Sequence, residues 1–445
     1  MNPLAAILFF ALAAMMLSAP RKWALAPFLA GCCLMTTGQG LDLGFISLPM
    51  FRLLILVGVV RVIIKGERID GSFNAIDKLL IFWAAWYLFA SFFHDWQLDA
   101  GPIFVSGVIY NLLGFYFLVR IWCSDLDDTK DVVKIIALLL VPVAISMLGE
   151  KYFAKNLFSY FGGVQDYIII REGKIRAQGP FLHPILAGTV GATCIPLFVG
   201  ILKEAKTIAI LGIVAAIIMV FSSASSGPIM SLMAAIFAIM IWRYRDHTRK
   251  MWIGAIVTYL LLMVVMERPP YYLISKIDLS GGSTGFHRSF LIDQTLQFFN
   301  EWWLFGTDHT RHWMPDQGTA SSPNHTDITN YYIGIAVGGG LLSLLLIVGI
   351  LIKSFGWVGQ IWREIHDDRP DNAFMIWCMG SALFSHVVTG ISVSYFDQSV
   401  FFFWLNVAVI SSMYSSVLYR ETAEEGAEES DGSEVTSRAL DKAFQ

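Results

Sequence analysis

Arginine and histidine side chains gather in two long hydrophilic segments of the sequence, residues 151–183 and 267–325. A guanidinium can bind a phosphate through two parallel hydrogen bonds, and an imidazole can exchange a proton near neutral pH. These residue types therefore predict a site for anion binding and proton transfer on one face of the molecule. Six of the nine histidines are predicted to lie on that face: His94, His183, His287, His309, His312 and His325.

The first motif is the stretch from Arg176 to Pro184, with the sequence Arg-Ala-Gln-Gly-Pro-Phe-Leu-His-Pro. Arg176 precedes a Gly-Pro turn, and His183-Pro184 is predicted to open a helix. A helix N-terminus carries partial positive charge, so Arg176 and His183 are candidates for binding a phosphate group. The alternative is an interfacial arginine that binds any lipid headgroup.

The second motif is Gly285-Phe-His287-Arg288-Ser-Phe, at the start of a predicted interfacial helix over Arg288–Trp303. Arg288 would share an anion with Arg176, and His287 would lie beside the substrate. The alternative is a surface anchor whose long side chain reaches the headgroups.

The third motif is Asn324-His325-Thr-Asp327, which precedes a glycine-rich apolar run. At the N-terminus of a membrane helix the imidazole of His325 would stay neutral and could deprotonate a sugar hydroxyl. Asn324 and Asp327 are candidate substrate contacts. The alternative is that this motif caps the helix.

The fourth motif runs from Asp308 to Asp316 and includes His309, which is predicted to contact substrate. Its two histidines and two aspartates invite a metal, but Pro315 and the short loop favour a polar substrate contact, and we predict no metal site. Two ionisable residues of the apolar runs, His386 and Asp397, are functional candidates or partners in hydrogen bonds between helices.

The elements that position these motifs are long apolar runs. Hydrophobic residues make up 56% of the 445-residue chain and charged residues 15%, with a mean hydropathy of +0.61. Because a membrane crossing needs about 20 apolar residues, we expect an all-α polytopic membrane protein with twelve or thirteen transmembrane helices. The predicted runs are 4–19, 23–38, 48–64, 79–93, 102–121, 132–149, 184–202, 207–221, 227–242, 251–266, 327–352, 373–391 and 398–418.

Lysine and arginine are concentrated in alternate loops between these runs, which predicts that those loops are cytoplasmic. The two long segments then lie outside. We expect a polytopic membrane domain over 1–419, with a large periplasmic loop at 267–325 carrying short interfacial helices. The acidic segment 420–445 is predicted to be a disordered cytoplasmic tail.

Several classes of function are excluded by composition. The net charge of −4 shows no excess of basic residues, which argues against nucleic-acid binding. The five cysteines lie in or beside apolar runs without metal-binding spacing. We find no phosphate-binding loop or dinucleotide motif. If the protein is a transferase, its donor must therefore be activated elsewhere. For a membrane protein whose predicted site faces outside, we expect a lipid-linked donor.

In their order and predicted topology, these motifs resemble the bacterial superfamily of O-antigen ligases and Wzy-type polysaccharide polymerases. The resemblance covers about residues 170–350. It departs at Ser225-Ser226-Gly227, where many members carry Ser-Arg-Gly. The motifs that carry it are Arg176–Pro184, Arg288, Trp303-Leu-Phe-Gly306 and Asn324-His325 with the glycine-rich run after it.

The resemblance implies a GT-C-like, metal-independent, inverting glycosyltransferase without a cofactor, in the bacterial inner membrane with its site facing the periplasm. The donor would be a glycan on undecaprenyl diphosphate, and the acceptor a glycan or lipid A core, in contact with membrane lipid. Arg176 and Arg288 would bind the diphosphate, and His325 would orient or deprotonate the acceptor. The tryptophans Trp302, Trp303 and Trp313 would stack on sugars, or anchor the loop at the interface.

Within this superfamily the leading interpretation is a polymerase of O-antigen or exopolysaccharide repeat units. The alternative is an O-antigen ligase acting on lipid A core or protein. A lipid-linked oligosaccharide flippase is less favoured, because the charges lie at the outer mouth and no repeat symmetry is evident. A polytopic scaffold would not need arginine and histidine clustered in two outside loops.

Overall fold

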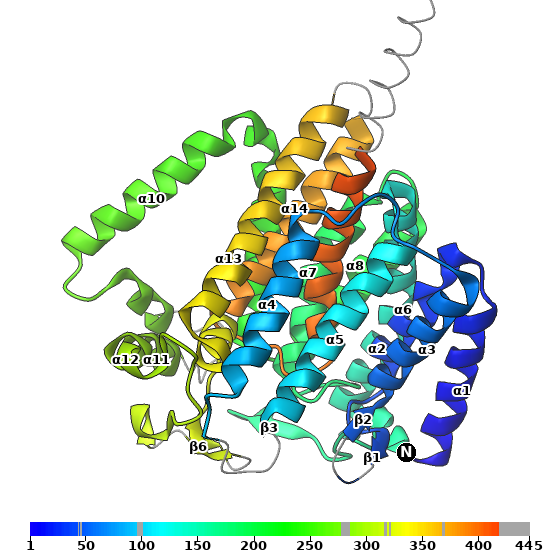
Figure 1. The fold of residues 1–445 in the computed structure, drawn as a ribbon, viewed down its shortest axis with the longest axis horizontal. Coiled ribbons are helices and arrows are strands. Elements are labelled where there is room, and N and C mark those ends of the chain that lie inside the picture. Colours follow the sequence, from blue (N-terminus) through cyan, green and yellow to red (C-terminus); the bar gives the residue numbers. More distant parts are fainter. Residues whose placement is uncertain are drawn as a thin grey trace, which may run out of the picture.

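A computed structural model describes residues 1–42, 44, 47–95, 101–276, 285–315, 318–319, 322–366 and 370–417. Each of the thirteen predicted apolar runs contains a helix (Figure 1). The helices, in chain order, are α1 (Pro3–Ser18), α2 (Leu25–Leu34), α3 (Met50–Lys65), α4 (Ala75–Ser91), α5 (Gly101–Trp122), α6 (Leu126–Phe153), α7 (Pro184–Gly200), α8 (Lys206–Ser222), α9 (Ser226–Met240), α10 (Thr248–Val265), α13 (Tyr331–Ile365), α14 (Pro370–Gly390) and Val400–Val417.

The fold is that of an all-α multi-pass membrane protein. Within the described ranges, six helical segments are long and apolar enough to cross a membrane. One of these six segments joins α9 to α10 through the 3-10 helix η3 (Ile241–His247), where the chain is kinked at Tyr244. Three further apolar helices, α1, α7 and α8, are shorter. The run at 23–38 holds only the ten residues of α2, so this segment is too short to span a bilayer as a straight helix. The number of crossings therefore stays a prediction.

Helix α7 lies at the centre of the bundle and packs against α8, α9 and α14. Nearly all of its residues are buried, and small residues allow the close approach. A Cβ atom added at Gly191 would lie 2.7 Å from the carbonyl oxygen of Ala216 on α8. The centre of the bundle therefore gives the start of α7, and His183 with it, a rigid support.

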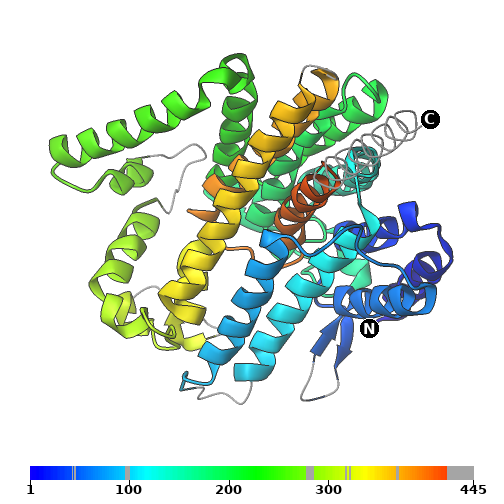
Figure 2. The ribbon, with the colours of Figure 1, turned by 45° about the horizontal axis from the view of Figure 1, so that its top comes forward.

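Helix α10 extends away from the bundle, as Figures 1 and 2 show. None of its residues is buried. After it the chain returns through the 3-10 helix η4 (Pro270–Lys276) to α11 (Gly285–Gln297) and α12 (Phe299–Trp302). The helix predicted over Arg288–Trp303 is thus broken at Phe298, which is the cap between α11 and α12.

Three antiparallel hairpins lie at one end of the bundle, which we call the hairpin end (Figure 1). The segment 151–183 contributes the 3-10 helix η2 (Leu157–Phe161) and the second hairpin, and the segment 267–325 contributes the third. The pairs are β1 (Gly40–Asp42) with β2 (Ser47–Pro49), β3 (Ile169–Arg171) with β4 (Lys174–Arg176), and β5 (Gly318–Thr319) with β6 (Ser322–Thr326).

The large loop is fixed to α13 where the turn Trp303–Gly306 meets the glycine-rich start of α13. Helix α13 is broken at Gly339 and Gly340, where φ of Gly340 is 74°. The turn Trp303–Gly306 fits against this break, and the backbone N–H of Leu341 donates to the carbonyl of Trp303 at 2.8 Å. A Cβ atom at Gly340 would lie 2.2 Å from the carbonyl oxygen of Leu304. Two of the motifs named from the sequence are therefore in direct contact.

The predicted acidic tail at 420–445 lies outside the described residues.

Candidate active site

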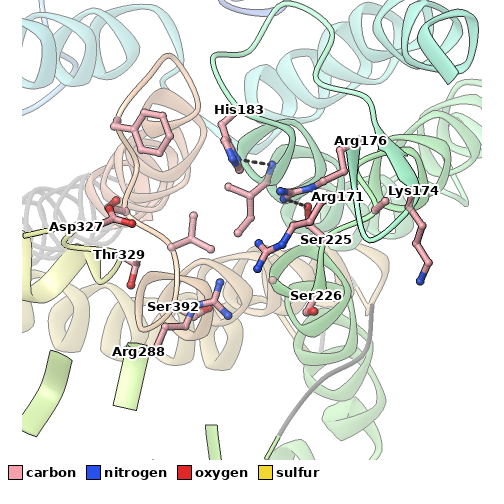
Figure 3. A pocket seen from close by; sticks show the side chains of 16 residues that line it. Arg171, Lys174, Arg176, His183, Ser225, Ser226, Arg288, Asp327, Thr329 and Ser392 are labelled. Carbon is pink, nitrogen blue, oxygen red and sulfur yellow. Dashed lines mark hydrogen bonds between the residues drawn. The ribbon is translucent and has the colours of Figure 1, made fainter. Parts of the chain in front are cut away.

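A cavity of about 290 Å³ at the hairpin end brings together residues from both long hydrophilic segments, 151–183 and 267–325 (Figure 3). Arg176, His183, Arg288 and Asp327, all predicted from the sequence, line it. The N-termini of α7 and α9 also reach the cavity, through His183 and Ser226, and each adds partial positive charge. The remaining lining comes mainly from Arg171, Lys174, Thr329 and the loop before the helix Val400–Val417.

Arg176 ends the second strand of the β3–β4 hairpin. The turn residues Glu172 and Gly173 have positive φ values of 52° and 71°, as a tight hairpin turn requires. The side chain of Arg176 is 7% exposed, and its Nη2 donates to Ser225 Oγ at 2.6 Å (Figure 3). Its buried Nε has no hydrogen-bond partner among the described residues.

The backbone that follows Arg176 is held by buried polar side chains from α6 and from two connecting segments. Glu150, near the end of α6, accepts from the N–H groups of Gln178 and Gly179. Asn156 donates to the carbonyl of Gly179 at 2.8 Å. Asp397 accepts from the N–H of Leu182 at 3.0 Å. The segment between Arg176 and His183 is therefore rigid, and both cavity side chains are positioned by it.

His183 caps the N-terminus of α7, as its position before Pro184 predicted. Its Nδ1 accepts from the N–H of Ile185 at 3.2 Å, so Nδ1 carries no proton. Burial, followed by repulsion from Arg176 and Arg171, lowers the pKa of His183 to about 4. The imidazole is therefore neutral near pH 7, with its proton on Nε2, where it can donate to a ligand oxygen.

Arg288 lies on α11, on the opposite side of the cavity in Figure 3. It is 7% exposed, which contradicts the alternative of a surface anchor. Its buried Nε, like that of Arg176, has no partner among the described residues. Burial is the main cause that lowers the pKa of Arg288, and Arg171 adds to it while Asp327 opposes it. Two buried guanidinium groups from segments over 100 residues apart in sequence thus line one cavity.

Arg171 and Lys174 were not singled out from the sequence, yet both line the cavity. The hairpin register pairs Arg171 with Lys174, and Ile169 with Arg176. The Glu172-Gly173 turn was the signal that would have placed these cations beside Arg176. Ser226, where the resemblance led us to look for an arginine, also lines the cavity. The β3–β4 hairpin thus supplies positive charge that α9 lacks.

His325 does not line the cavity, although it was the predicted acid–base residue. It lies on β6, and the prediction that it begins a membrane helix was wrong, because α13 begins at Tyr331 with Asn330 as its cap. His325 Nδ1 is 3.3 Å from Thr310 Oγ1. Burial lowers its pKa, so its neutral form is favoured by desolvation rather than by a helix end. Asp327, two residues later, does line the cavity.

The other predicted contacts surround His325 and Asp327. His287 Nε2 is 3.0 Å from the carbonyl oxygen of Asp327. Asn324 accepts from the N–H of Thr310 through its backbone carbonyl. His309 Nε2 lies 3.6 Å from Asp308 and 3.8 Å from Asp95. These residues form a polar group beside the cavity. Among the described residues, no three His, Cys, Asp or Glu side chains are placed to hold a metal ion.

The tryptophans of the large loop differ in their exposure. Trp302 and Trp313 are 4% and 2% exposed, in a small core with Leu291 and Met314. The prediction that these two stack on sugars was therefore wrong, because their faces are covered by protein. Trp303 is 45% exposed and can contact a glycan or the membrane interface.

The two ionisable residues of the apolar runs make hydrogen bonds within the bundle. His386 Nδ1 is 2.9 Å from the Tyr395 hydroxyl. Asp397 binds the Leu182 N–H, as described above, and therefore also supports the cavity.

Residues 211–348 match the family model described as O-antigen ligase. The matched segment begins within α8 and ends within α13, so it contains Arg288 and His325, while Arg176 and His183 lie before it. No match was found among curated proteins. The family match supports a glycan-transferring membrane enzyme. Residues 211–348 are therefore similar to the O-antigen ligase family, and the resemblance identified from the sequence is confirmed for this segment.

Proposed function

We propose that the cavity transfers a glycan from an undecaprenyl diphosphate donor to a hydroxyl group of an acceptor. The observation that carries this proposal is the convergence of Arg176 and Arg288, both buried, with the neutral His183 on one cavity. Two guanidinium groups that line one cavity favour a dianionic ligand.

In the proposed reaction the acceptor hydroxyl attacks the anomeric carbon while the bond from that carbon to the diphosphate oxygen breaks. Negative charge then builds on the leaving diphosphate. Arg176, Arg288 and the Nε2–H of His183 would stabilise that charge, a contribution commonly of several kcal/mol in enzymes. Attack from the face opposite the leaving group inverts the anomeric centre.

The hydroxyl proton needs an acceptor, and two residues can serve. His325 is the residue that the resemblance implies, and its lowered pKa favours the neutral, basic form. Asp327 is the acidic residue of the cavity lining, and its position beside Arg288 supports a role in binding the acceptor. We propose His325 as the base and Asp327 as the residue that orients the acceptor, since catalytic contacts often tighten only when substrate binds.

We propose that the physiological reaction polymerises lipid-linked repeat units at the periplasmic face of the bacterial inner membrane. Transfer to lipid A core or to protein uses the same donor chemistry and differs only in the acceptor, so a ligase is the alternative. The concentration of cations around one cavity at the hairpin end favours transfer over flipping of the lipid-linked glycan.

The test is binding of undecaprenyl diphosphate, the leaving group, to the purified full-length protein in nanodiscs. We expect tighter binding than for undecaprenyl phosphate, and at least a tenfold loss in an Arg176→Gln/Arg288→Gln variant. A Lys206→Gln/Lys250→Gln variant, which removes two exposed cations elsewhere, should bind as the wild type does. Equal binding by the arginine variant would exclude the cavity as the diphosphate site. Transfer by the protein should also persist in a chelator, and rescue of a lost activity by added metal would contradict the metal-free reaction.

A further inference from the structure

A second cavity, of about 490 Å³, lies between the N-terminal end of α4, helix α13 and the helix Val400–Val417. These helix ends lie at the opposite end of the bundle from the hairpins (Figure 1). The cavity is therefore separate from the candidate active site. It is lined by Gly71, Ser72, Phe73, Asn74, Ala75, Lys78, Lys353, Trp357, Tyr414 and Ser415.

The lining of this cavity is positively charged. Lys78 comes from α4 and Lys353 from α13, and the ten lining residues include no acid. Two other lysines predicted to lie at this end are paired with acids, Lys22 with Asp131 and Lys203 with Asp371. Neither Lys78 nor Lys353 forms an ion pair within the described part of the chain. Two like charges on one cavity favour an anionic ligand.

The floor of the cavity adds a further hydrogen-bond donor. Ser415 Oγ accepts from Asn74 Nδ2 at 2.9 Å and from Arg120 Nη2 at 3.1 Å. The Arg120 guanidinium is itself paired with Asp77 in the buried core. Because Ser415 accepts from both neighbours, its own hydroxyl proton is left for an acceptor in the cavity.

The wall of the cavity is aromatic. Trp357 and Tyr414 stack at 4.0 Å with an interplanar angle of 7°. Phe73, at the rim, is 51% exposed. Two exposed lysines beside aromatic side chains, near the ends of apolar helices, match a molecule with an anionic head and an apolar body.

We propose that this cavity binds the phosphate headgroup of an anionic phospholipid of the predicted cytoplasmic leaflet. Lys78, Lys353 and the Ser415 hydroxyl would hold the phosphate, and Phe73 would contact the acyl region. The site is independent of the proposed glycan transfer. It ties the first turn of α4 to α13, the helix against which the large loop is fixed.

The experiment is native mass spectrometry of the full-length protein in neutral detergent, titrated with phosphatidylglycerol or phosphatidylcholine. We expect the wild type to retain one phosphatidylglycerol molecule, with at least a tenfold preference over phosphatidylcholine. Lys78→Gln/Lys353→Gln should lose that preference, while Lys78→Arg/Lys353→Arg should keep it, which also shows that the site tolerates substitution.

Three controls decide the assignment. The Lys206→Gln/Lys250→Gln variant removes the same two positive charges from outside the cavity and should keep the preference for phosphatidylglycerol. If this variant lost as much preference as Lys78→Gln/Lys353→Gln, the lipid would be attracted by overall surface charge, and the proposal would be overturned. Displacement of the lipid by inorganic phosphate at an equal concentration would assign the site to free phosphate instead. Truncation after residue 419 should change nothing, and a gain in lipid binding would show that the acidic tail is the occupant.

Discussion

The carboxylate of Glu150 accepts a hydrogen bond of 3.0 Å from the backbone N–H of Gly179, across 29 positions of sequence. The same carboxylate binds the N–H of Gln178, and Glu150 is 1% exposed. A residue of α6 thus fixes the turn between Arg176 and the neutral His183 of the candidate active site. This contact gives the turn one conformation and sets the approach of Arg176 to the cavity.

Replacing Glu150 by Leu should impair both stability and donor binding. Two buried N–H groups would lose their acceptor, at a cost of about 1–3 kcal/mol each. We expect a lower unfolding temperature and at least tenfold weaker binding of undecaprenyl diphosphate. Glu150→Gln keeps one acceptor oxygen and should be intermediate in both measurements. Glu172→Gln, at the exposed hairpin turn, is the control; an effect there as large as at Glu150 would argue against a specific role for the turn.

Arg176→Lys and Arg288→Lys should each lower glycan transfer by about 10²–10³-fold, because an ammonium cannot reproduce the two parallel hydrogen bonds of a guanidinium. The loss should appear mainly in kcat if the arginines act on the leaving group. Arg268→Lys removes a guanidinium of the same loop that lies over Tyr272, outside the cavity, and should keep its activity. Full transfer by either cavity variant would remove that residue from the mechanism.

The protonation of His183 predicts how stability depends on pH. Its pKa is about 4 in the folded protein and near 6.5 when unfolded, so the unfolded chain binds more protons between these values. Stability should therefore fall as the pH is lowered from about 6.5 to 4, by up to roughly 3 kcal/mol from this group. His183→Asn keeps a helix cap and cannot titrate, so its unfolding temperature should change less over that range. Identical pH curves for the two proteins would show that His183 is not held neutral.

Gly340→Ala should displace the large loop from α13. The positive φ of 74° is strained for alanine, and the added Cβ would meet the carbonyl of Leu304 at 2.2 Å. We expect a fall in unfolding temperature of several degrees and loss of transfer. Gly349→Ala, on the same helix with nothing within 4 Å, should be neutral or slightly stabilising. If Gly340→Ala behaved like Gly349→Ala, the loop would not depend on this contact.

The helices of this protein could be predicted because their signal is local. Each apolar run contains a helix, and His183-Pro184 marks the start of α7 as expected. Hydropathy could not distinguish a short buried helix such as α2 from a crossing, since both are apolar. It also could not show that Trp302 and Trp313 are covered by protein.

The candidate site could be predicted only in part. Arg176 and Arg288 were predicted because guanidinium groups bind phosphate and both residues lie in the long hydrophilic segments. Arg171 and Ser392 reach the cavity through hairpin register and helix packing, which join segments far apart in the sequence. His325 was expected at a helix start, but Asn330 provides the cap, and the histidine lies on a strand instead.

The most direct test of the central claim is mass spectrometry of undecaprenyl diphosphate-linked glycans in a strain that lacks this gene, complemented with wild type, Arg176→Ala or Arg288→Ala. We predict that lipid-linked glycans accumulate without the gene and with either variant, while the wild type clears them. Accumulation of single repeat units would identify a polymerase, and accumulation of long chains a ligase. An unchanged pool of lipid-linked glycans in the strain without the gene, or full clearance by both arginine variants, would contradict glycan transfer in this cavity.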